Sequence, residues 1–180
     1  ALSTVQDQIA FTSRLAESLQ TIEGLHGSPA NLTEITRAAA NRMQPFCVPN
    51  NLSLTADLPA EAVNVQADAA LLAQAVNGLL NYALRESTSG SQAGLRLERT
   101  HEGLAHLSVQ FIGPALDTNT LTRIFNTAPL NDPNRSRRFF SAVISLPLVK
   151  EIVLKFNGKI WADRQPGQTT VFHILLPVSQ

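Results

Sequence analysis

The stretch from Leu71 to Ser87 contains the residues closest to an active-site motif, on the most regular helix pattern in the chain. Gly78, Tyr82 and Arg85 follow one another at i, i+4 and i+7, which places them along one flank of a helix. Beside that flank, apolar residues recur at helical spacing and predict one wide buried stripe. The stripe consists of Leu71, Leu72, Ala75, Val76, Leu79, Leu80, Ala83 and Leu84. We expect the chemistry of this chain, or what remains of it, on the flank.

Other kinds of catalytic centre find no support in the sequence. The chain has no defensible Ser-His-Asp spacing, no paired carboxylates in an apolar setting and no cluster with metal-ligand spacing. His101 falls at an expected turn and His106 on an expected strand, and no second histidine or acid lies at metal spacing from them. We therefore predict no metal site and interpret both histidines as solvated or packed.

Length and composition suit one domain, with an appended helix, that is part of a longer protein. The chain has 180 residues, a net charge of zero and only 16% charged residues, so neither nucleic acid nor an anionic membrane is implied as a partner. The single cysteine, Cys47, excludes an intramolecular disulfide and predicts a reducing, cytoplasmic location, with its side chain buried as a small hydrophobe. No apolar run reaches the roughly 18 residues of a membrane span.

The remaining patterns predict a mixture of helices and strands. A helix capped by Asn31 should run to about Pro45, and a hairpin should turn at residues 101–103. The inward residues of the helix capped by Asn31 should be Leu32, Ile35, Ala38, Ala39 and Met43. Strands are expected at 52–56, 63–66, 95–99 and 104–112, and Asp68 should cap the central helix.

The central helix resembles the N-box helix of the histidine-kinase catalytic domain, which is the Bergerat-fold (GHKL) ATPase module. The family pattern is roughly Leu-x-Gln-x-Leu-x-Asn-Leu-Leu-x-Asn-Ala-x-Lys. The residues that fit it are Leu72, Gln74, Leu79, Leu80, Ala83 and Arg85. Gly78 and Tyr82 stand where the family has asparagines, and the resemblance gives the second asparagine a role in holding Mg²⁺. A neutral phenol is a poor ligand for that ion.

The segment that resembles the adenine-binding box also differs from the family at its polar position. The family has Asp-x-Gly-x-Gly-Ile, in which the aspartate accepts the adenine amino hydrogen bond. Here Phe111 takes the place of that aspartate, Gly113 is kept, and Ala115 replaces the second glycine. A phenyl ring accepts no such bond and fills space that the base needs.

The segment 126–141 would be the ATP lid, after a short helix at Leu121–Phe125 that matches the family well. Its cluster of Arg135, Arg137 and Arg138 could bind an anion, but a solvated loop is the favoured interpretation. Where the family has Gly-x-Gly for the phosphates, the chain has Val143 and Ser145, and the serine instead suits a helix cap.

The closing third matches the family best, with a helix ending at Asn157-Gly158 and a last turn at Pro166-Gly167. Trp161 and Phe172 are interpreted as core of this terminal hairpin rather than as a stacking platform. The resemblance implies an α+β fold: a two-layer α/β sandwich with the mixed GHKL sheet, helices on one face, and one preceding N-terminal helix.

The first residues resemble the end of the dimerising helix that precedes such catalytic domains. Ile22-Glu23-Gly24 is similar to its closing sequence, so we expect a dimerisation helix over 1–24, an ATPase-like domain over 25–180, and a homodimer through 1–23. A rival register matches residues 2–9 to the phospho-acceptor box, with Asp7 where the histidine would stand. Neither register supplies a phospho-acceptor histidine.

Together these substitutions predict a pseudokinase: a histidine-kinase-like domain without catalytic residues or a cofactor, which works by protein contact in a two-component signalling protein. We expect Tyr82 and Phe111 to fold into the vacated nucleotide pocket. One alternative is a divergent active kinase that binds ATP and Mg²⁺ and uses the lid arginines for phosphate. Another is a phosphotransferase that does not need ATP. A response regulator or a partner kinase would be the protein partner.

Overall fold

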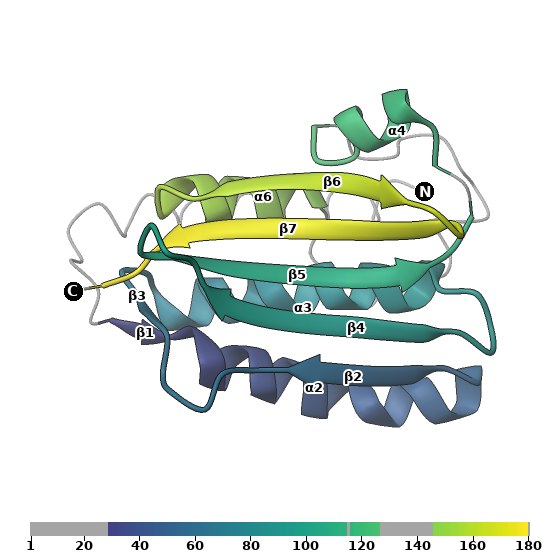
Figure 1. Ribbon diagram of the computed structural model, residues 1–180, viewed down its shortest axis with the longest axis horizontal. Helices are drawn as coiled ribbons and strands as arrows, with labels where there is room; N and C mark the ends of the chain where they lie inside the picture. Colours follow the sequence, from purple (N-terminus) through teal and green to yellow (C-terminus); the bar gives the residue numbers. More distant parts are fainter. Residues whose placement is uncertain (1–28, 115, 127–145, 180) are drawn as a thin grey trace, which may run out of the picture.

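The computed structural model describes residues 29–114, 116–126 and 146–179. Its main sheet has five strands in the order β2-β4-β5-β7-β6, which lie side by side in Figure 1. The strands are β2 (Ser53–Asp57), β4 (Gln92–Arg99), β5 (Leu104–Ile112), β6 (Lys159–Gln165) and β7 (Thr169–Pro177). β2 is parallel to β4 and the other neighbours are antiparallel, so the sheet is mixed, as expected.

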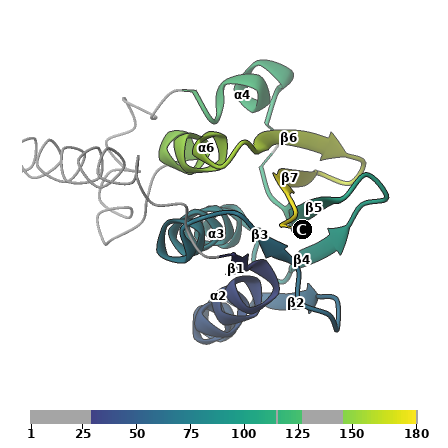
Figure 2. The same ribbon diagram turned by 90° about the vertical axis from the view of Figure 1, so that its left-hand side faces the viewer.

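Three helices cover one face of this sheet, and the other face has no described element over it (Figure 2). They are α2 (Leu32–Cys47), α3 (Ala69–Glu86) and α6 (Leu146–Lys155). α3 lies in the middle, packed against α2, α6 and β5. The predicted two-layer arrangement is therefore confirmed.

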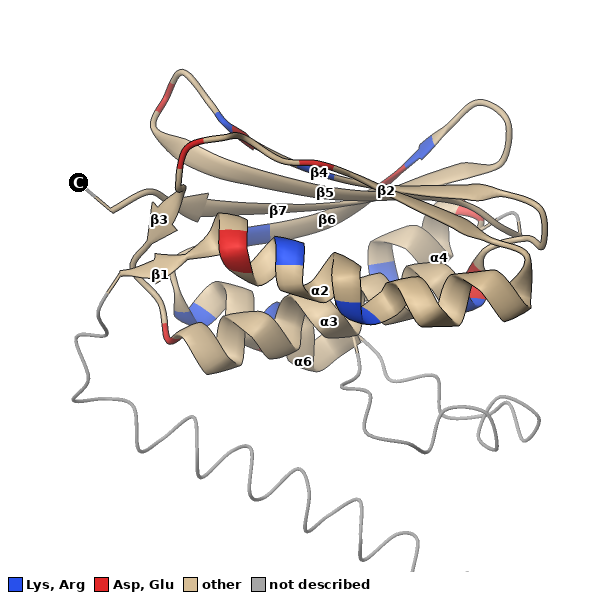
Figure 3. Ribbon diagram, turned by 90° about the horizontal axis from the view of Figure 1, so that it is seen from below, with Lys and Arg blue, Asp and Glu red and all other residues tan. Residues whose placement is uncertain are grey.

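Smaller elements complete the described chain. The 3₁₀ turn η2 (Val48–Asn50) follows α2, and the short α4 (Thr118–Arg123) lies beyond the β6 edge. β1 (Ala30–Asn31) and β3 (Asn64–Val65) pair as a separate two-stranded sheet. Seen from below, acidic and basic residues are interspersed over the described elements rather than gathered into a patch of one sign (Figure 3).

The core fills the space between the helices and the sheet. Every residue of the predicted α3 stripe is buried, and the inward positions of β4, β5 and β7 meet it. Alternation places Leu95, Leu107 and Phe172 on this inner face, each fully buried. Burying a side chain of this size contributes about 1.5–3 kcal/mol, so this layer holds the fold together.

The α2 helix begins as predicted, but its buried face differs. The Asn31 side chain accepts from the amide of Glu34 at 3.1 Å, which is the expected cap. Thr33 and Thr36 are buried, whereas Ala38 is exposed and Ile35 and Met43 are half-buried. The helix also continues past Pro45 to Cys47, with Pro45 inside its last turn.

Cys47 is buried, as its apolar neighbours predicted. Its thiol lies 3.4 Å from the carbonyl oxygen of Met43, and burial raises the pKa of the thiol. Metal-ligating side chains do not converge in groups of three anywhere in the described ranges. None of the helices within those ranges is both long and apolar enough to cross a bilayer.

Candidate functional site

The central helix α3 begins at a side-chain cap. The Asp68 carboxylate accepts from the amide of Leu71 at 2.8 Å, so one of the free amides of the first turn is satisfied. The helix ends at Ser87, whose hydroxyl donates to the carbonyl of Ala83 at 2.7 Å. These two ends fix the register in which the flank residues meet their neighbours.

The flank of Gly78, Tyr82 and Arg85 lies along α3 as predicted, with Gly78 buried and the other two half-buried. Arg85 donates from Nε to the Oδ1 of Asn81 at 2.6 Å. Its guanidinium carbon also lies 5.8 Å from the ring centroid of Phe46, which belongs to α2. The Arg85 side chain thus forms a hydrogen bond within α3 and a cation–π contact with a ring of α2.

Four aromatic rings meet beside this flank. Phe172, on β7, is central, and its ring centroid lies 5.6 Å from Tyr82, 5.3 Å from Phe111 and 5.5 Å from Phe125. The three contacts are tilted or edge-on, which is the favoured geometry for aromatic pairs. We call Tyr82, Phe111, Phe125 and Phe172 the aromatic cluster. It joins α3, β5, β7 and the residues that follow α4.

Phe111 is the member of the aromatic cluster that bears most directly on nucleotide recognition. Its side chain is 1% exposed and points from β5 to the inner face, opposite Thr170 of β7. The resemblance places a hydrogen-bond acceptor for adenine at this position. A buried phenyl ring offers no acceptor, and the Phe111 ring packs against Phe172.

Gly113 is required by packing alone. A Cβ atom on this residue would lie 2.5 Å from the carbonyl oxygen of Glu86, at the end of α3. That distance is far inside van der Waals contact, so only glycine fits where β5 passes the end of the helix. Retention of this glycine is therefore not evidence for nucleotide binding.

Several predicted positions lie outside the described residues. They are Ala115, Val143 and Ser145, and the lid arginines Arg135, Arg137 and Arg138. The expected helix over 1–23, with Asp7 in its rival register, also lies outside them.

A groove of about 560 Å³ runs between α4, α6 and the edge strand β6. Phe125, a member of the aromatic cluster, lines this groove and packs on Phe172, so the groove lies next to the rest of the cluster. Lys150 contributes a cation and hydrogen-bonds to Asn126 across the groove. Arg164 donates from Nη1 to the carbonyl of Leu116 at 2.9 Å, which ties β6 to the segment before α4.

The outer face of the sheet has a group of residues that the sequence did not identify. His106 on β5 and His173 on β7 approach to 3.0 Å, from Nε2 to Nδ1. Trp161 on β6 stacks on His173 with 4.8 Å between ring centroids. The interpretation of Trp161 as hairpin core is therefore wrong, because its strand position faces outward, whereas Phe172 is in the core as predicted.

His106 is packed, which is one of the two environments expected for it, but its neighbours, an acid and a second histidine, were not foreseen. Glu98 lies 3.2 Å from its Nδ1 atom. Glu98, His106, Trp161 and His173 occupy alternate strand positions that face outward. This alternation is the only feature of the sequence that could have indicated that they share a face. The register that brings β5 and β7 together, with His173 opposite Ser108, cannot be read from alternation. His101 is exposed in its turn, as expected.

Comparison with known proteins supports the resemblance. The model of the family described as "Histidine kinase-, DNA gyrase B-, and HSP90-like ATPase" matches residues 67–180. The adaptive-response sensory kinase SasA of Prochlorococcus marinus is 29% identical over 150 residues, covering 83% of this chain. The alginate biosynthesis sensor protein KinB of Pseudomonas aeruginosa is 29% identical over 174 residues, covering 97%. The chain spans only 39% and 28% of the lengths of these two relatives.

Solved structures share the fold. The nucleotide-free catalytic domain of histidine kinase ThkA superimposes with a TM-score of 0.70 at 19% identity. The match covers 83% of this chain and 94% of that domain. The expected GHKL fold is thus confirmed.

Proposed function

The chain belongs to the family of histidine kinase-, DNA gyrase B- and HSP90-like ATPases, and from this premise we propose that it is a pseudokinase module of a two-component signalling protein. In this proposal it does not bind ATP and acts through protein contacts. One relative is named as a sensory kinase and another as a sensor protein, which supports a role in sensor signalling. Residues 1–24 would be the end of a dimerisation helix and 25–180 the ATPase-like domain.

The packing of Phe111 on Phe172 carries the proposal. The two ring centroids lie 5.3 Å apart, and both side chains are almost fully buried. For adenine to enter, Phe111 would have to leave this contact and expose its ring. Even then the base would find no carboxylate at this position. Tyr82 adds a third ring at the helix position where the resemblance expects a ligand of Mg²⁺.

The energies support the same conclusion. A lost hydrogen bond to a buried partner costs about 1–3 kcal/mol. Loss of metal coordination adds to this, whereas a micromolar site has only about 8 kcal/mol of binding free energy in total. Arg85, which matches the family's lysine, is already bonded to Asn81 and stacked on Phe46. Little affinity for nucleotide should therefore remain.

Protein partners follow from the same family. We propose a homodimer through residues 1–23, with a response regulator or a partner kinase as a further contact. Under this proposal the open face of the sheet and the groove beside α4 are two described surfaces available for such contacts.

A phosphate-transfer assay tests the proposal against its two rivals. The full chain is incubated with γ-labelled ATP and Mg²⁺, then with an active partner kinase and a response regulator. We expect no label on the chain in any mixture. Label from ATP alone would establish an active kinase. Label that reaches the chain only from the partner proteins would establish a phosphotransferase, and either result would overturn the proposal.

A further inference from the structure

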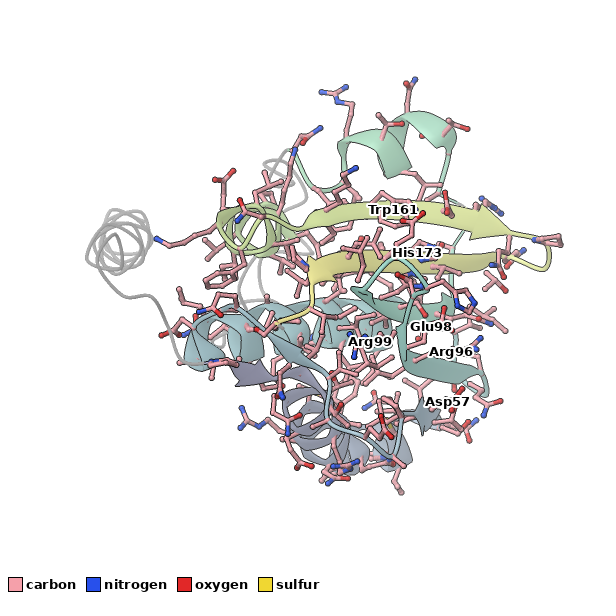
Figure 4. All side chains as sticks on the ribbon, turned by 60° about the vertical axis from the view of Figure 1, so that its left-hand side comes forward. Asp57, Arg96, Glu98, Arg99, Trp161 and His173 are labelled. Carbon is pink, nitrogen blue, oxygen red and sulfur yellow. The ribbon has the colours of Figure 1, made fainter. Side chains whose placement is uncertain are left out.

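A row of polar side chains crosses the outer face of the sheet from edge to edge. Figure 4 shows Asp57, Arg96, Glu98, His173 and Trp161 following one another over the strands. Arg96 lies 3.5 Å from Asp57 on β2 and 3.0 Å from Glu98 on its own strand. The row thus begins with an ion-pair group on β2 and β4.

The middle of the row is a chain of three contacts through two imidazoles. Glu98 Oε1 lies 3.2 Å from Nδ1 of His106, and Nε2 of His106 lies 3.0 Å from Nδ1 of His173. Nε2 of His173 then lies 3.3 Å from Oδ2 of Asp163 on β6. The same Asp163 oxygen accepts from the indole Nε1 of Trp161 at 3.1 Å.

Counting hydrogens shows that neutral imidazoles cannot satisfy this chain. Each neutral ring has one N–H, so the pair has two hydrogens for three contacts. Whichever tautomers form, at least one contact sets a lone pair against a carboxylate, or two lone pairs against each other. One additional proton fills all three contacts. A second would place N–H against N–H across the 3.0 Å gap between the rings.

We propose that His106 and His173 form a binding site for a single proton on the outer face of the sheet, and that its occupancy links the edge strand β6 to the rest of the sheet. With the proton bound, Glu98 accepts a hydrogen bond from the pair, and Asp163 faces the cationic ring of His173 at 3.3 Å. The contacts then run without a break from β4 through β5 and β7 to β6. Without it, one of them is lost.

The burial of the pair supports this. The side chains of His106 and His173 are 22% and 14% exposed, so water replaces a missing contact poorly. Nε2 of His173 is buried and its approach to Asp163 is not aligned as a hydrogen bond, which leaves this atom unsatisfied. Burial lowers the pKa of His173, the charge of His106 lowers it further, and Asp163 opposes both effects. Binding of a second proton to the histidine pair is therefore unfavourable.

Charged groups from each neighbouring strand tune the site. Glu98 and Asp163 face the pair directly and favour the proton. Arg96 neutralises Glu98 and is itself paired with Asp57. Lys159 shares the outer face on β6, opposite Leu175. Proton affinity should therefore fall when a carboxylate is removed and rise when Arg96 is removed.

Trp161 makes the test direct, because it is the only tryptophan in the chain and it stacks on His173. Its fluorescence is followed from pH 8 to pH 5 in the full chain, and imidazole signals are followed by NMR in parallel. We expect one transition that fits uptake of a single proton by the pair. Two independent one-proton titrations, or a fluorescence that does not change with pH, would overturn the proposal.

Variants separate the site from general effects of pH. His106→Gln and His173→Gln together should abolish the transition, and the matched control His101→Gln, in the exposed turn, should leave it unchanged. If the double variant does not fold, substitutions at half-buried Glu98 and at exposed Arg96 decide between the outcomes. Glu98→Gln should move the midpoint to lower pH and Arg96→Gln to higher pH. Midpoints that do not move, or that move in the same direction, would contradict the single-proton site.

Discussion

Phe111 and Phe172 pack ring against ring across the β5–β7 pair, with centroids 5.3 Å apart and planes tilted by 56°. Phe111 is 1% exposed and Phe172 is completely buried. In the family that this chain belongs to, the resemblance places the adenine acceptor at the first of these two positions. Under the proposed function this contact occupies space that the base would need, and its consequences can be measured.

Truncation of Phe111 should behave as a core mutation. Phe111→Ala removes a buried ring and leaves a cavity beside Phe172, so we expect a loss of about 3–5 kcal/mol in the free energy of unfolding. Urea denaturation measures it. The adjacent Gln110→Ala, on an exposed position of the same strand, should change stability by no more than about 0.5 kcal/mol. Equal effects of the two variants would contradict the aromatic cluster.

Gly113 should be intolerant of substitution for a reason unrelated to ligand. In Gly113→Ala the new methyl would meet the Glu86 carbonyl at 2.5 Å, and we expect a loss of about 1–3 kcal/mol. Gly94→Ala is the matched control, because its nearest neighbour would be Thr55 Oγ1 at 3.9 Å. Thermal unfolding compares the two variants. A neutral Gly113→Ala would show that the close approach of β5 to α3 is wrong.

The cap of α3 should contribute measurably to stability. Asp68→Ala removes the acceptor for the Leu71 amide and should cost about 1 kcal/mol. Asp68→Asn keeps an acceptor oxygen and should be close to neutral. The difference between the two variants in urea isolates the hydrogen bond. A neutral alanine variant would mean that α3 does not depend on this cap.

The short α4 should lose its cap in acid. The hydrogen bond from the Thr120 amide lowers the pKa of Asp117 below its ordinary value of 3.8. A carboxylate with a lowered pKa stabilises the helix above the ordinary value, and this stabilisation is lost as the pH falls through the lowered pKa. NMR of the Asp117 carboxyl carbon and of the α4 amides should show both changes below pH 3.8. In Asp117→Asn the helix should not respond to pH in this range.

The helices could be predicted well, because burial of one helix face leaves a regular spacing of apolar residues in the sequence. The eight apolar residues predicted for α3 are all buried, and the caps at Asn31 and Asp68 are where side-chain chemistry placed them. Boundaries moved by one to a few residues, as at Pro45, where a proline in the last turn did not end the helix. Thr33 was missed because its hydroxyl is satisfied by a partner distant in sequence, the Val63 amide at 3.0 Å.

The outer face could not be predicted, since strand register is a tertiary property. His106 and His173 are 67 positions apart, and a shift of one residue between β5 and β7 would separate them. Trp161 was assigned to the core because large aromatics are usually buried there. Its strand position instead sets it outward, against two imidazoles.

The central claim is that aromatic packing has replaced nucleotide binding, and calorimetric titration of the full chain with ATP and Mg²⁺ tests it most directly. We predict no saturable heat at micromolar to submillimolar ATP, with or without the metal. Magnesium-dependent binding with a micromolar Kd would contradict the account, because Phe111 and Tyr82 would then have to yield their places to the base and the ion.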